Sequence, residues 1–406
     1  MLSMLSISLE PWGGRVRSAR TRADGSGGLV ADAPARARAD TGHHPDPAGP
    51  ARADGLAVHV EDGLAAVRLL LVDDAAARRA RARELAAEHA ALWRAVGEQV
   101  GGGRLMRPRL TVAAYLGLGG TDLAAVAPVA AAQEVLHTAM LVHDDVLDHD
   151  ETRRGRPNVT GTVRRRLAAR GVEGPAADGP VLAAGLLGGD LAIAAAFDLV
   201  ASAPVPAATA LRVVRSMARA VDMTVAGELL DVTGALHGPT SVDALRVAEL
   251  KTSVYSCCTP LSAGAVLAGA DEAVCGVLDR FGTAFGIAFQ LLDDELGVFG
   301  DPAVTGKSVL SDLREGKRTE LLRLAYLRAD GAQRAVLDAL VGRPDLSEDD
   351  AARVRAVMED SGALHEARLV RADAVRTART TAREGLPDEL AGYLTGLVDA
   401  TAGVAG

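Results

Sequence analysis

Apolar residues recur every three or four positions along most of the chain from about Val58 onward, and this spacing is typical of amphipathic helices. Few stretches alternate between apolar and polar positions, as strands do. Good helix formers dominate the chain, and aromatic residues make up 3% of it. The pattern therefore predicts an all-α fold, with helices over residues 75–96, 111–133, 127–149, 180–202, 207–236, 241–270, 273–299, 316–342, 347–359 and 362–384.

Residues 1–57 differ from the rest of the chain. They are rich in Ala, Arg, Gly and Pro and show little apolar periodicity. Such a segment buries too little apolar surface to offset the entropy of ordering it, so we expect a disordered tail. An arginine-rich contact arm and a wrongly extended start stay open as alternatives. The composition does not shift again, and residues 58–406 are expected to form a single helical domain.

The charge balance and the cysteines restrict the setting of the protein. A formal net charge of −9 leaves no domain-wide basic surface, which argues against nucleic acid as the main partner. Cys257, Cys258 and Cys275 lack disulfide or metal-ligand spacing, as expected in the reducing cytoplasm. The longest uncharged stretch, 253–270, contains Ser, Thr, Pro and Gly and does not resemble a transmembrane segment. No secretory signal is expected either, because the first residues lack a basic start.

Two aspartate clusters follow apolar segments in matching contexts. Asp144 and Asp145, with Asp148, end the first segment, and Asp293 and Asp294 end the second. A desolvated carboxylate without a partner is strongly unfavourable. We therefore expect the two clusters to face each other across a cavity in which cations hold the charge. Mg²⁺ bound by few protein carboxylates usually completes its shell with substrate phosphates, which indicates an enzyme acting on a phosphorylated substrate.

The first cluster lies on one face of a predicted helix. His137, Leu141, Asp144 and Asp148 are spaced i, i+4, i+7 and i+11, and Asp145 borders this face. A solvated helix end is the ordinary interpretation of such acids. The arginines that follow favour a magnesium-diphosphate site instead, because arginine suits bidentate phosphate binding. These arginines are Arg153 and Arg154.

The second cluster also has basic companions. Gln290, Asp293, Asp294 and Gly297 share a helix face, and Lys307 and Lys317 follow downstream. Upstream, Lys251 and Thr252 lie in a segment that is otherwise uncharged for many residues. Buried lysines are rare unless paired, so Lys251 is a candidate phosphate ligand. A lysine that extends to the surface is the alternative.

A third basic site lies near the beginning of the predicted domain. Three glycines, 101–103, precede Arg104 and Arg107. Glycines permit close approach of the backbone, and two arginines three positions apart can bind a second anion. Alone, this segment would be read as an ordinary connection between helices.

Together, these motifs resemble the trans-isoprenyl diphosphate synthases, the polyprenyl synthetase family, from residue 101 to about residue 320. The two aspartate clusters, the Lys251-Thr252 pair, the string from Phe289 to Asp294, Gly306-Lys307 and the string 312–317 occur in the family's order. The resemblance implies an all-α bundle with a central pocket, usually a homodimer. It also implies head-to-tail condensation of isopentenyl diphosphate with an allylic diphosphate.

The resemblance assigns a role to each candidate residue. Three Mg²⁺ ions on the allylic diphosphate are expected at Asp144, Asp148 and Asp293, with Asp145 and Asp294 in support. The same diphosphate is expected to contact Arg153, Lys251, Lys307 and Lys317. Isopentenyl diphosphate is expected at Arg104, Arg107, His137 and Arg154. Thr252 and Gln290, grouped with Lys251 as catalytic residues, are expected to face the developing allylic cation.

This sequence departs from the family's pattern at three places. Arg104 stands where a lysine is usual, and Leu105 where arginine is common. Gly297 stands where many members have the last aspartate of the second cluster, for which Asp301 is a candidate replacement. The carboxyl-terminal end lacks a recognisable basic tail.

Product length in the family is set below the first aspartate cluster. Ala139 and Met140 stand where farnesyl-forming members often carry aromatic residues, so a C20 product is favoured. Met140 is flexible enough to close the pocket, which leaves C15 open. The metal motif itself can be read as ending at Asp148 or at Asp150.

Two other functions stay open. A non-catalytic regulatory partner subunit of such a synthase would be expected to lack an aspartate pair or Lys251, and this chain lacks neither. A terpene cyclase on the same fold would pair one aspartate cluster with an Asn/Ser/Glu motif and would not need the anion site at Arg104 and Arg107.

Overall fold

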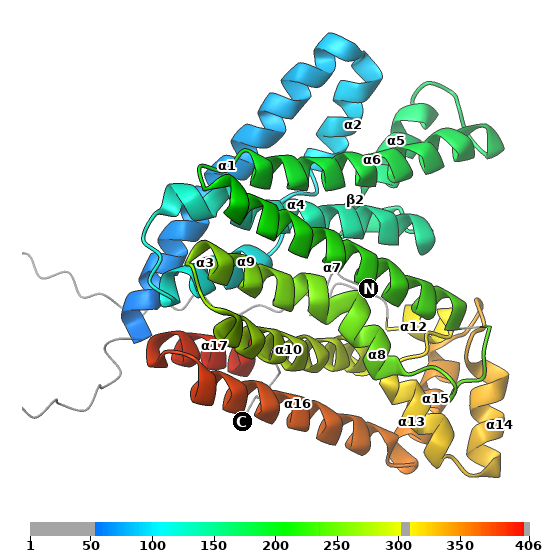
Figure 1. Cartoon of the computed structure of the whole chain (residues 1–406). Coiled ribbons are helices and arrows are strands. Elements are labelled where there is room, and N and C mark those ends of the chain that lie inside the picture. The colour runs from blue at the N-terminus through cyan, green and yellow to red at the C-terminus, as the bar shows by residue number, and fades with distance from the viewer. Residues whose placement is uncertain (1–52, 235, 302–308, 402–406) are drawn as a thin grey trace, which may run out of the picture.

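The structure, a computed structural model, describes residues 53–234, 236–301 and 309–401 (Figure 1). Two short strands, β1 (Thr152–Arg153) and β2 (Arg156–Pro157), pair antiparallel. The π-helix η1 spans Glu249–Cys258. The α-helices are α1 (Ala53–Leu85), α2 (Ala87–Gly97), α3 (Met106–Gly117), α4 (Leu123–Leu147), α5 (Val159–Ala168), α6 (Pro175–Ala201), α7 (Ala207–Gly234), α8 (Ala244–Ala248), α9 (Thr259–Leu267), α10 (Glu272–Phe299), α12 (Ser311–Glu315), α13 (Glu320–Arg328), α14 (Gly331–Leu340), α15 (Glu348–Asp360), α16 (Ala363–Gly385) and α17 (Asp388–Thr401).

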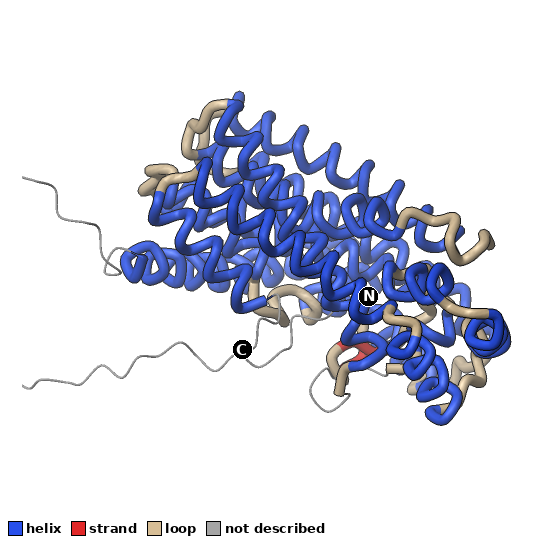
Figure 2. The backbone as a smooth tube through the Cα atoms, turned by 90° about the horizontal axis from the view of Figure 1, so that it is seen from below, coloured by secondary structure: helices blue, strands red, loops and turns tan. Residues whose placement is uncertain are grey.

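The helices form a bundle (Figures 1 and 2), and α4 and α10 take central places in it (Figure 1). α4 packs against α1, α3 and α6, while α10 packs against η1 and α16. A main apolar core connects helices from α1 to α17, and a second core joins α12 to α16 at one end of the bundle. The predicted all-α fold is confirmed.

Capping residues fix where the two central helices begin. Asp122 accepts hydrogen bonds from the backbone N–H groups of Ala124 and Ala125 at the start of α4. Asp271 accepts one from Val274 at the start of α10. Such caps satisfy N–H groups that have no partner inside the helix. Because both starts are fixed, the helical repeat places the aspartate clusters at the end of α4 and within the last two turns of α10.

The predicted helices are found, with several breaks. The predicted helix 75–96 is interrupted at Ala86, and 111–133 is divided between α3 and α4 at Gly119, whose φ is +95°. The predicted helix 316–342 is divided at Asp330, which caps α14 with a capping box. The segment 241–270 consists of α8, η1 and α9, because its middle forms a π-helix. Elements that we did not predict are the β1–β2 hairpin, α5, α12, α17 and the part of α1 before residue 75.

The predicted amino-terminal tail, residues 1–57, extends too far into the chain. α1 already begins at Ala53, inside the stretch 1–57, and residues 1–52 lie outside the described residues. A disordered tail followed by a single domain stays a prediction.

Three helices, α4, α6 and α10, are long and apolar enough to cross a membrane by length and composition alone. The apolar window of α4 is 94% buried inside the protein, that of α10 is 50% buried and that of α6 is 39% buried. Burial in the bundle accounts for the composition of α4, and α10 carries the second aspartate cluster. The absence of a transmembrane segment stays a prediction.

Candidate active site

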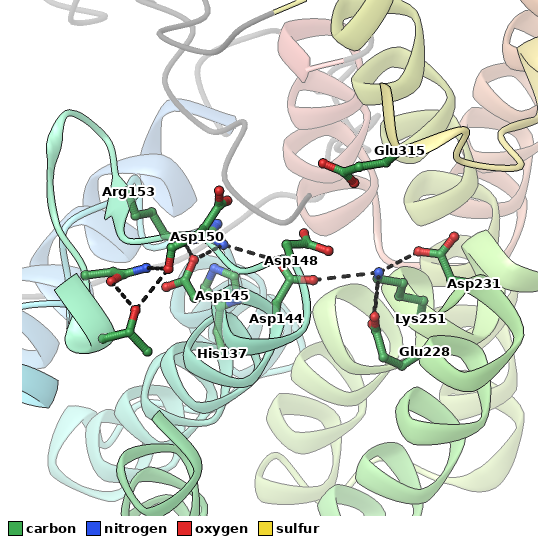
Figure 3. Close-up of polar contacts among 12 residues, drawn as sticks. His137, Asp144, Asp145, Asp148, Asp150, Arg153, Glu228, Asp231, Lys251 and Glu315 are labelled. Atoms are coloured by element: carbon green, nitrogen blue, oxygen red, sulfur yellow. Dashed lines mark hydrogen bonds and ion pairs between the residues drawn. The ribbon is translucent and has the colours of Figure 1, made fainter. Parts of the chain in front are cut away.

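The first aspartate cluster lies at the carboxyl-terminal end of α4 and is buried. Asp144 is 3% exposed and Asp145 2%. Asp148 caps the helix, and its backbone N–H donates to the Asp144 carbonyl oxygen. Figure 3 shows the Asp144 side chain with Arg153 on one side and Lys251 on the other.

Arg153 neutralises the first cluster from the β1–β2 hairpin. Its Nη2 lies 2.6 Å from Asp145 Oδ1 and 3.2 Å from Asp144 Oδ2. Burial raises the pKa of the Asp145 carboxyl to about 6, although the Arg153 guanidinium opposes this shift. Arg153 thus does not fully offset the burial of Asp145.

Lys251 reaches the same cluster from η1. Its Nζ lies 2.7 Å from Asp231 Oδ2, 2.9 Å from Glu228 Oε2 and 3.7 Å from Asp144 Oδ1. The side chain is buried and ion-paired, so it does not extend to the surface. α7 and η1 approach closely here, since a Cβ at Gly227 would lie 2.5 Å from the backbone nitrogen of Lys251.

Lys317 connects the first cluster to the segment after α10. Its Nζ lies 3.5 Å from Asp148 Oδ2, 2.9 Å from Glu315 Oε2 and 3.9 Å from Asp312 Oδ1. Burial lowers its pKa, but the carboxylates of Asp312, Asp148 and Glu315 outweigh burial and raise it. Lys317 therefore stays charged.

The second cluster is joined to η1 by hydrogen bonds. Thr252 Oγ1 donates to Gln290 Oε1 at 2.7 Å, and Gln290 Nε2 donates to Asp294 Oδ1 at 2.8 Å. Burial raises the pKa of Asp294 well above its usual value, and the charges of Asp293 and Asp312 add to the shift. Asp294 is therefore a carboxyl group that ionises readily only when positive charge is added nearby.

The third basic site gathers around Arg107 on α3. Arg107 Nη2 donates to Ser256 Oγ at 2.7 Å and to Tyr255 Oη at 3.2 Å, and its guanidinium lies 5.0 Å from the centre of the Tyr255 ring. His137 Nδ1 lies 3.3 Å from the same Tyr255 Oη. Burial, followed by Arg107 and Arg154, lowers the pKa of His137 well below its usual value, so this histidine is neutral.

Arg154 joins this basic cluster from the hairpin turn. It has a φ of 54°, and Gly155 after it has a φ of 70°. A Cβ at Gly102 would lie 2.7 Å from Arg154 Nη1, so the guanidinium rests against the glycine segment. Arg104 lies half-buried in the loop that leads into α3. The glycines thus allow close approach, as predicted, by an arginine of the protein itself.

The structure brings together most of the predicted site residues. The first cluster, Arg153, Lys251 and Lys317 lie in one ion-pair network, while His137 and Arg107 are joined through Tyr255. Lys307 lies outside the described residues. Asp150 and Asp301 are exposed. Ala139 is fully buried in the main core and Met140 is half-buried beside it.

Several residues of the site were not predicted from the sequence. Glu228 and Asp231, on α7, hold Lys251, and Tyr255 and Ser256, on η1, hold Arg107. Glu134 lies one turn before His137 on α4 and is 4% exposed. Burial raises its pKa, although the charges of Arg107 and Arg154 oppose this shift. The sequence could have indicated Glu134, because it is a carboxylate inside an otherwise apolar predicted helix. The α7 and η1 residues could not be predicted, because their partners are distant in the sequence and are brought close only by helix packing.

The donor set fits Mg²⁺ that arrives with a phosphorylated ligand. In the part of the chain that the structure describes, no three Asp, Glu, His or Cys side chains converge closely enough to hold a metal ion by themselves. Mg²⁺ commonly takes one or two carboxylates and completes its shell with water and substrate phosphates. Buried carboxyl groups on α4 and α10, with raised pKa values at Asp145 and Asp294, provide such partial sites.

Comparisons with known proteins agree with this geometry. The polyprenyl synthetase family model matches residues 90–359. A geranylfarnesyl diphosphate synthase from Aeropyrum pernix is 37% identical over 268 residues, which cover 65% of this chain and 77% of the relative. A geranylgeranyl diphosphate synthase from Mycobacterium tuberculosis is 33% identical over 301 residues, covering 72% and 79%. The crystal structure of a geranylgeranyl pyrophosphate synthase from Corynebacterium glutamicum, complexed with isoprenyl diphosphate and magnesium, has a TM-score of 0.78 and 31% identity, covering 83% of this chain and 97% of that one.

Proposed function

This chain belongs to the polyprenyl synthetase family and is a prenyltransferase, and we propose that it performs the Mg²⁺-dependent head-to-tail condensation of isopentenyl diphosphate with an allylic diphosphate. One observation carries the proposal. Buried aspartate pairs on α4 and α10 accompany Arg153, Lys251 and Lys317, and a separate basic cluster contains Arg107 and Arg154. Two anionic substrates need two such sites.

The allylic diphosphate is proposed to bind between the two aspartate clusters. Asp144 and Asp148 would hold metal from α4, and Asp293 would hold it from α10, with Asp145 and Asp294 behind them. Three bound Mg²⁺ ions, the number that the resemblance implies, would neutralise the departing diphosphate. The C. glutamicum relative was solved with isoprenyl diphosphate and magnesium, which supports the same ligand class here.

The cationic side chains of this site are already held in place. Lys251 is fixed by Glu228 and Asp231, and Arg153 by Asp144 and Asp145. Preorganised charges stabilise a developing negative charge without reorganising during the reaction. Lys317 joins this site through Asp148, and Lys307 is proposed to join it as well.

Isopentenyl diphosphate is proposed to bind at the basic cluster that contains Arg107 and Arg154. Arg104, Arg107 and Arg154 supply positive charge, and the neutral His137 supplies a ring nitrogen for hydrogen bonding. Because its pKa is lowered, His137 is not needed as a general base. The proton lost after carbon–carbon bond formation is proposed to pass to the released diphosphate.

Thr252 and Gln290 are proposed to face the allylic cation. The Thr252 hydroxyl donates to the Gln290 side-chain carbonyl, which leaves the hydroxyl lone pairs available to a cation. Both side chains are buried, at 1% and 6% exposed. Exclusion of water protects the cation from being quenched.

The product is proposed to be a short-chain prenyl diphosphate, with C20 favoured and C15 as the alternative. No aromatic side chain stands at residues 139 and 140 of α4, so no ring at these two positions would limit the length of the product. Relatives named as geranylgeranyl, farnesyl and geranylfarnesyl diphosphate synthases bracket this range.

A cytoplasmic homodimer is proposed as the working form. Three free cysteines fit a reducing compartment. Exposed apolar side chains lie along α6 and α7, as expected for a surface that a second copy of the chain covers. These side chains are Leu182, Leu186, Leu187, Leu211, Val225, Leu229, Leu230 and Val232.

Product analysis tests the function directly. The purified full chain is incubated with Mg²⁺, isopentenyl diphosphate and, in turn, dimethylallyl, geranyl and farnesyl diphosphate, and the products are sized by mass spectrometry. Elongation of at least one primer, lost when EDTA removes Mg²⁺, is expected. Absence of elongation with every primer would contradict the proposal.

A further inference from the structure

Gly297 removes a side chain from the face of α10 that carries the second aspartate cluster. It lies four positions after Asp293 and three after Asp294, so the three residues share a helix face. A glycine inside a helix costs stability relative to alanine, which suggests a specific reason for it here.

The space beside Gly297 is filled by a carboxylate from another element. α12 packs against α10, and a Cβ built on residue 297 would collide with Asp312 Oδ2. The Asp312 carboxylate therefore occupies the volume that a side chain at residue 297 would enter. Its negative charge contributes to the raised pKa of Asp294, so the two carboxyl groups share one electrostatic environment.

The backbone around Asp312 is firmly held. The Lys317 N–H donates to the Asp312 carbonyl oxygen at 3.0 Å across the turn at Gly316, whose φ is 63°. Arg314 Nη2 donates to the Leu346 carbonyl oxygen at 2.8 Å, which ties α12 to the second core. These hydrogen bonds hold the backbone of α12 in place, and so they fix the position of the Asp312 side chain beside α10.

Asp312 has a long ion pair with a lysine that also contacts other carboxylates. The Asp312 side chain is 13% exposed, and Lys317, 3.9 Å away, is shared with Asp148 and Glu315. The Lys317 ammonium group thus contacts three carboxylates, and Asp312 is the most distant of them. A mostly buried carboxylate in this position favours additional positive charge.

We propose that Asp312 supplies the carboxylate that the second aspartate cluster lacks at residue 297, and that Gly297 is glycine because Asp312 occupies its place. The inference rests on the proposed function, since the cation is Mg²⁺ bound with a diphosphate. It replaces Asp301, which is exposed, as the candidate for the late carboxylate.

Variants of the full chain separate this role from a merely structural one. Inorganic diphosphate is added to the protein over a range of Mg²⁺ concentrations, and the rise in Tm gives the Mg²⁺ concentration for half-maximal stabilisation. Asp312→Asn is expected to raise that concentration about tenfold. Gly297→Asp alone is expected to lower the Tm, because the new side chain meets Asp312. The combined G297D/D312A variant, in which the shortened side chain at residue 312 makes room, is expected to return the Mg²⁺ requirement to within about threefold of the wild-type value, because the carboxylate is moved rather than removed. D312A alone should raise the requirement as D312N does.

Glu315→Gln is the matched control. Glu315 lies closer to Lys317 than Asp312 does, at 2.9 Å, but Gly297 is in contact with Asp312. This variant should change the Mg²⁺ requirement less than about twofold, as expected for a half-exposed ion pair. An equal shift in E315Q and D312N would overturn the inference by showing that Asp312 acts only through Lys317.

Two further outcomes would also overturn it: a wild-type Mg²⁺ requirement in D312N, or no recovery in G297D/D312A relative to D312A. Failure of the proposed function looks different. In that case the wild-type protein itself shows neither Mg²⁺-dependent stabilisation by diphosphate nor condensation activity.

Discussion

Lys251 Nζ lies 2.7 Å from Asp231 Oδ2, and this ion pair joins η1 to α7 beside the first aspartate cluster. The lysine side chain is 6% exposed and that of Asp231 is 12% exposed. Glu228 and Asp144 complete the surroundings of the ammonium group. Although burial lowers the pKa of Lys251, Asp231, Asp144 and Glu228 raise it well above its usual value. The site therefore contains a permanently charged lysine that is positioned before any ligand binds.

Removing Lys251 should destabilise the protein as well as inactivate it. Lys251→Met leaves three buried or half-buried carboxylates without their shared cation, which should cost about 3 kcal/mol of unfolding free energy. Asp231→Asn in the same chain removes part of that repulsion, so the two changes should couple by about 2 kcal/mol. Urea unfolding of the two single variants and the double variant measures the coupling. Additive effects would show that the pair is not energetically linked.

An exposed pair nearby provides the control. Arg246 Nη1 lies 2.7 Å from Glu249 Oε2, but these side chains are 49% and 30% exposed. Glu249→Gln should therefore change the unfolding free energy by less than about 1 kcal/mol.

Asp293 and Asp301 should differ sharply although both lie near the end of α10. Asp293 is 6% exposed on the face that carries Asp294, whereas Asp301 is exposed beyond the helix end. We expect Asp293→Asn to lower kcat/KM for condensation by about 10²- to 10³-fold, and Asp301→Asn to have little effect. Steady-state rates at saturating Mg²⁺ check this, with far-ultraviolet circular dichroism as the folding control. Equal losses in both variants would contradict the assignment of Asp293.

Local sequence patterns predicted the parts of the site that depend on helix periodicity. The spacing of His137, Asp144 and Asp148 predicts that they share one helix face, and they lie on α4 and its C-cap. The all-α fold followed from the same periodicity.

Contacts between distant segments could not be read from spacing. The pairing of Lys251 with Glu228 and Asp231 depends on the close approach of η1 to α7 at Gly227. The placement of Asp312 beside Gly297 depends on how α12 packs against α10. No periodicity within one helix encodes such contacts, because they are set by which helices touch and how closely.

The stability of the protein should depend on His137 in mildly acidic solution. Burial and the nearby arginines lower the pKa of His137 in the folded protein well below its usual value. The unfolded chain takes up a proton at this residue near pH 6.5, whereas the folded protein does not. Its contribution is therefore fully present above about pH 6.5 and is lost as the pH falls below that value, by up to about 1.4 kcal/mol per pH unit.

Denaturant unfolding of the wild type and of His137→Gln between pH 5 and pH 8 measures this contribution. As the solution becomes acidic, the unfolding free energy of the wild type should fall relative to that of His137→Gln. Parallel pH profiles would show that His137 is protonated to the same extent in the folded and unfolded states.

Met140 and Ala139, which the sequence groups together as candidates for chain-length control, should behave differently. Met140 is half-buried and packs beside both the main core and Tyr255, whereas Ala139 is fully buried in the core. Met140→Phe should shift the products toward shorter chains, because a ring closes space below Asp144, and Met140→Ala should shift them toward longer ones. Ala139→Phe should instead overpack the core and cost about 1–3 kcal/mol of unfolding free energy. Mass spectrometry of the products and denaturant unfolding distinguish the two effects. A change in product length caused by Ala139→Phe without loss of stability, or an unchanged product in both Met140 variants, would assign the control of chain length to other residues.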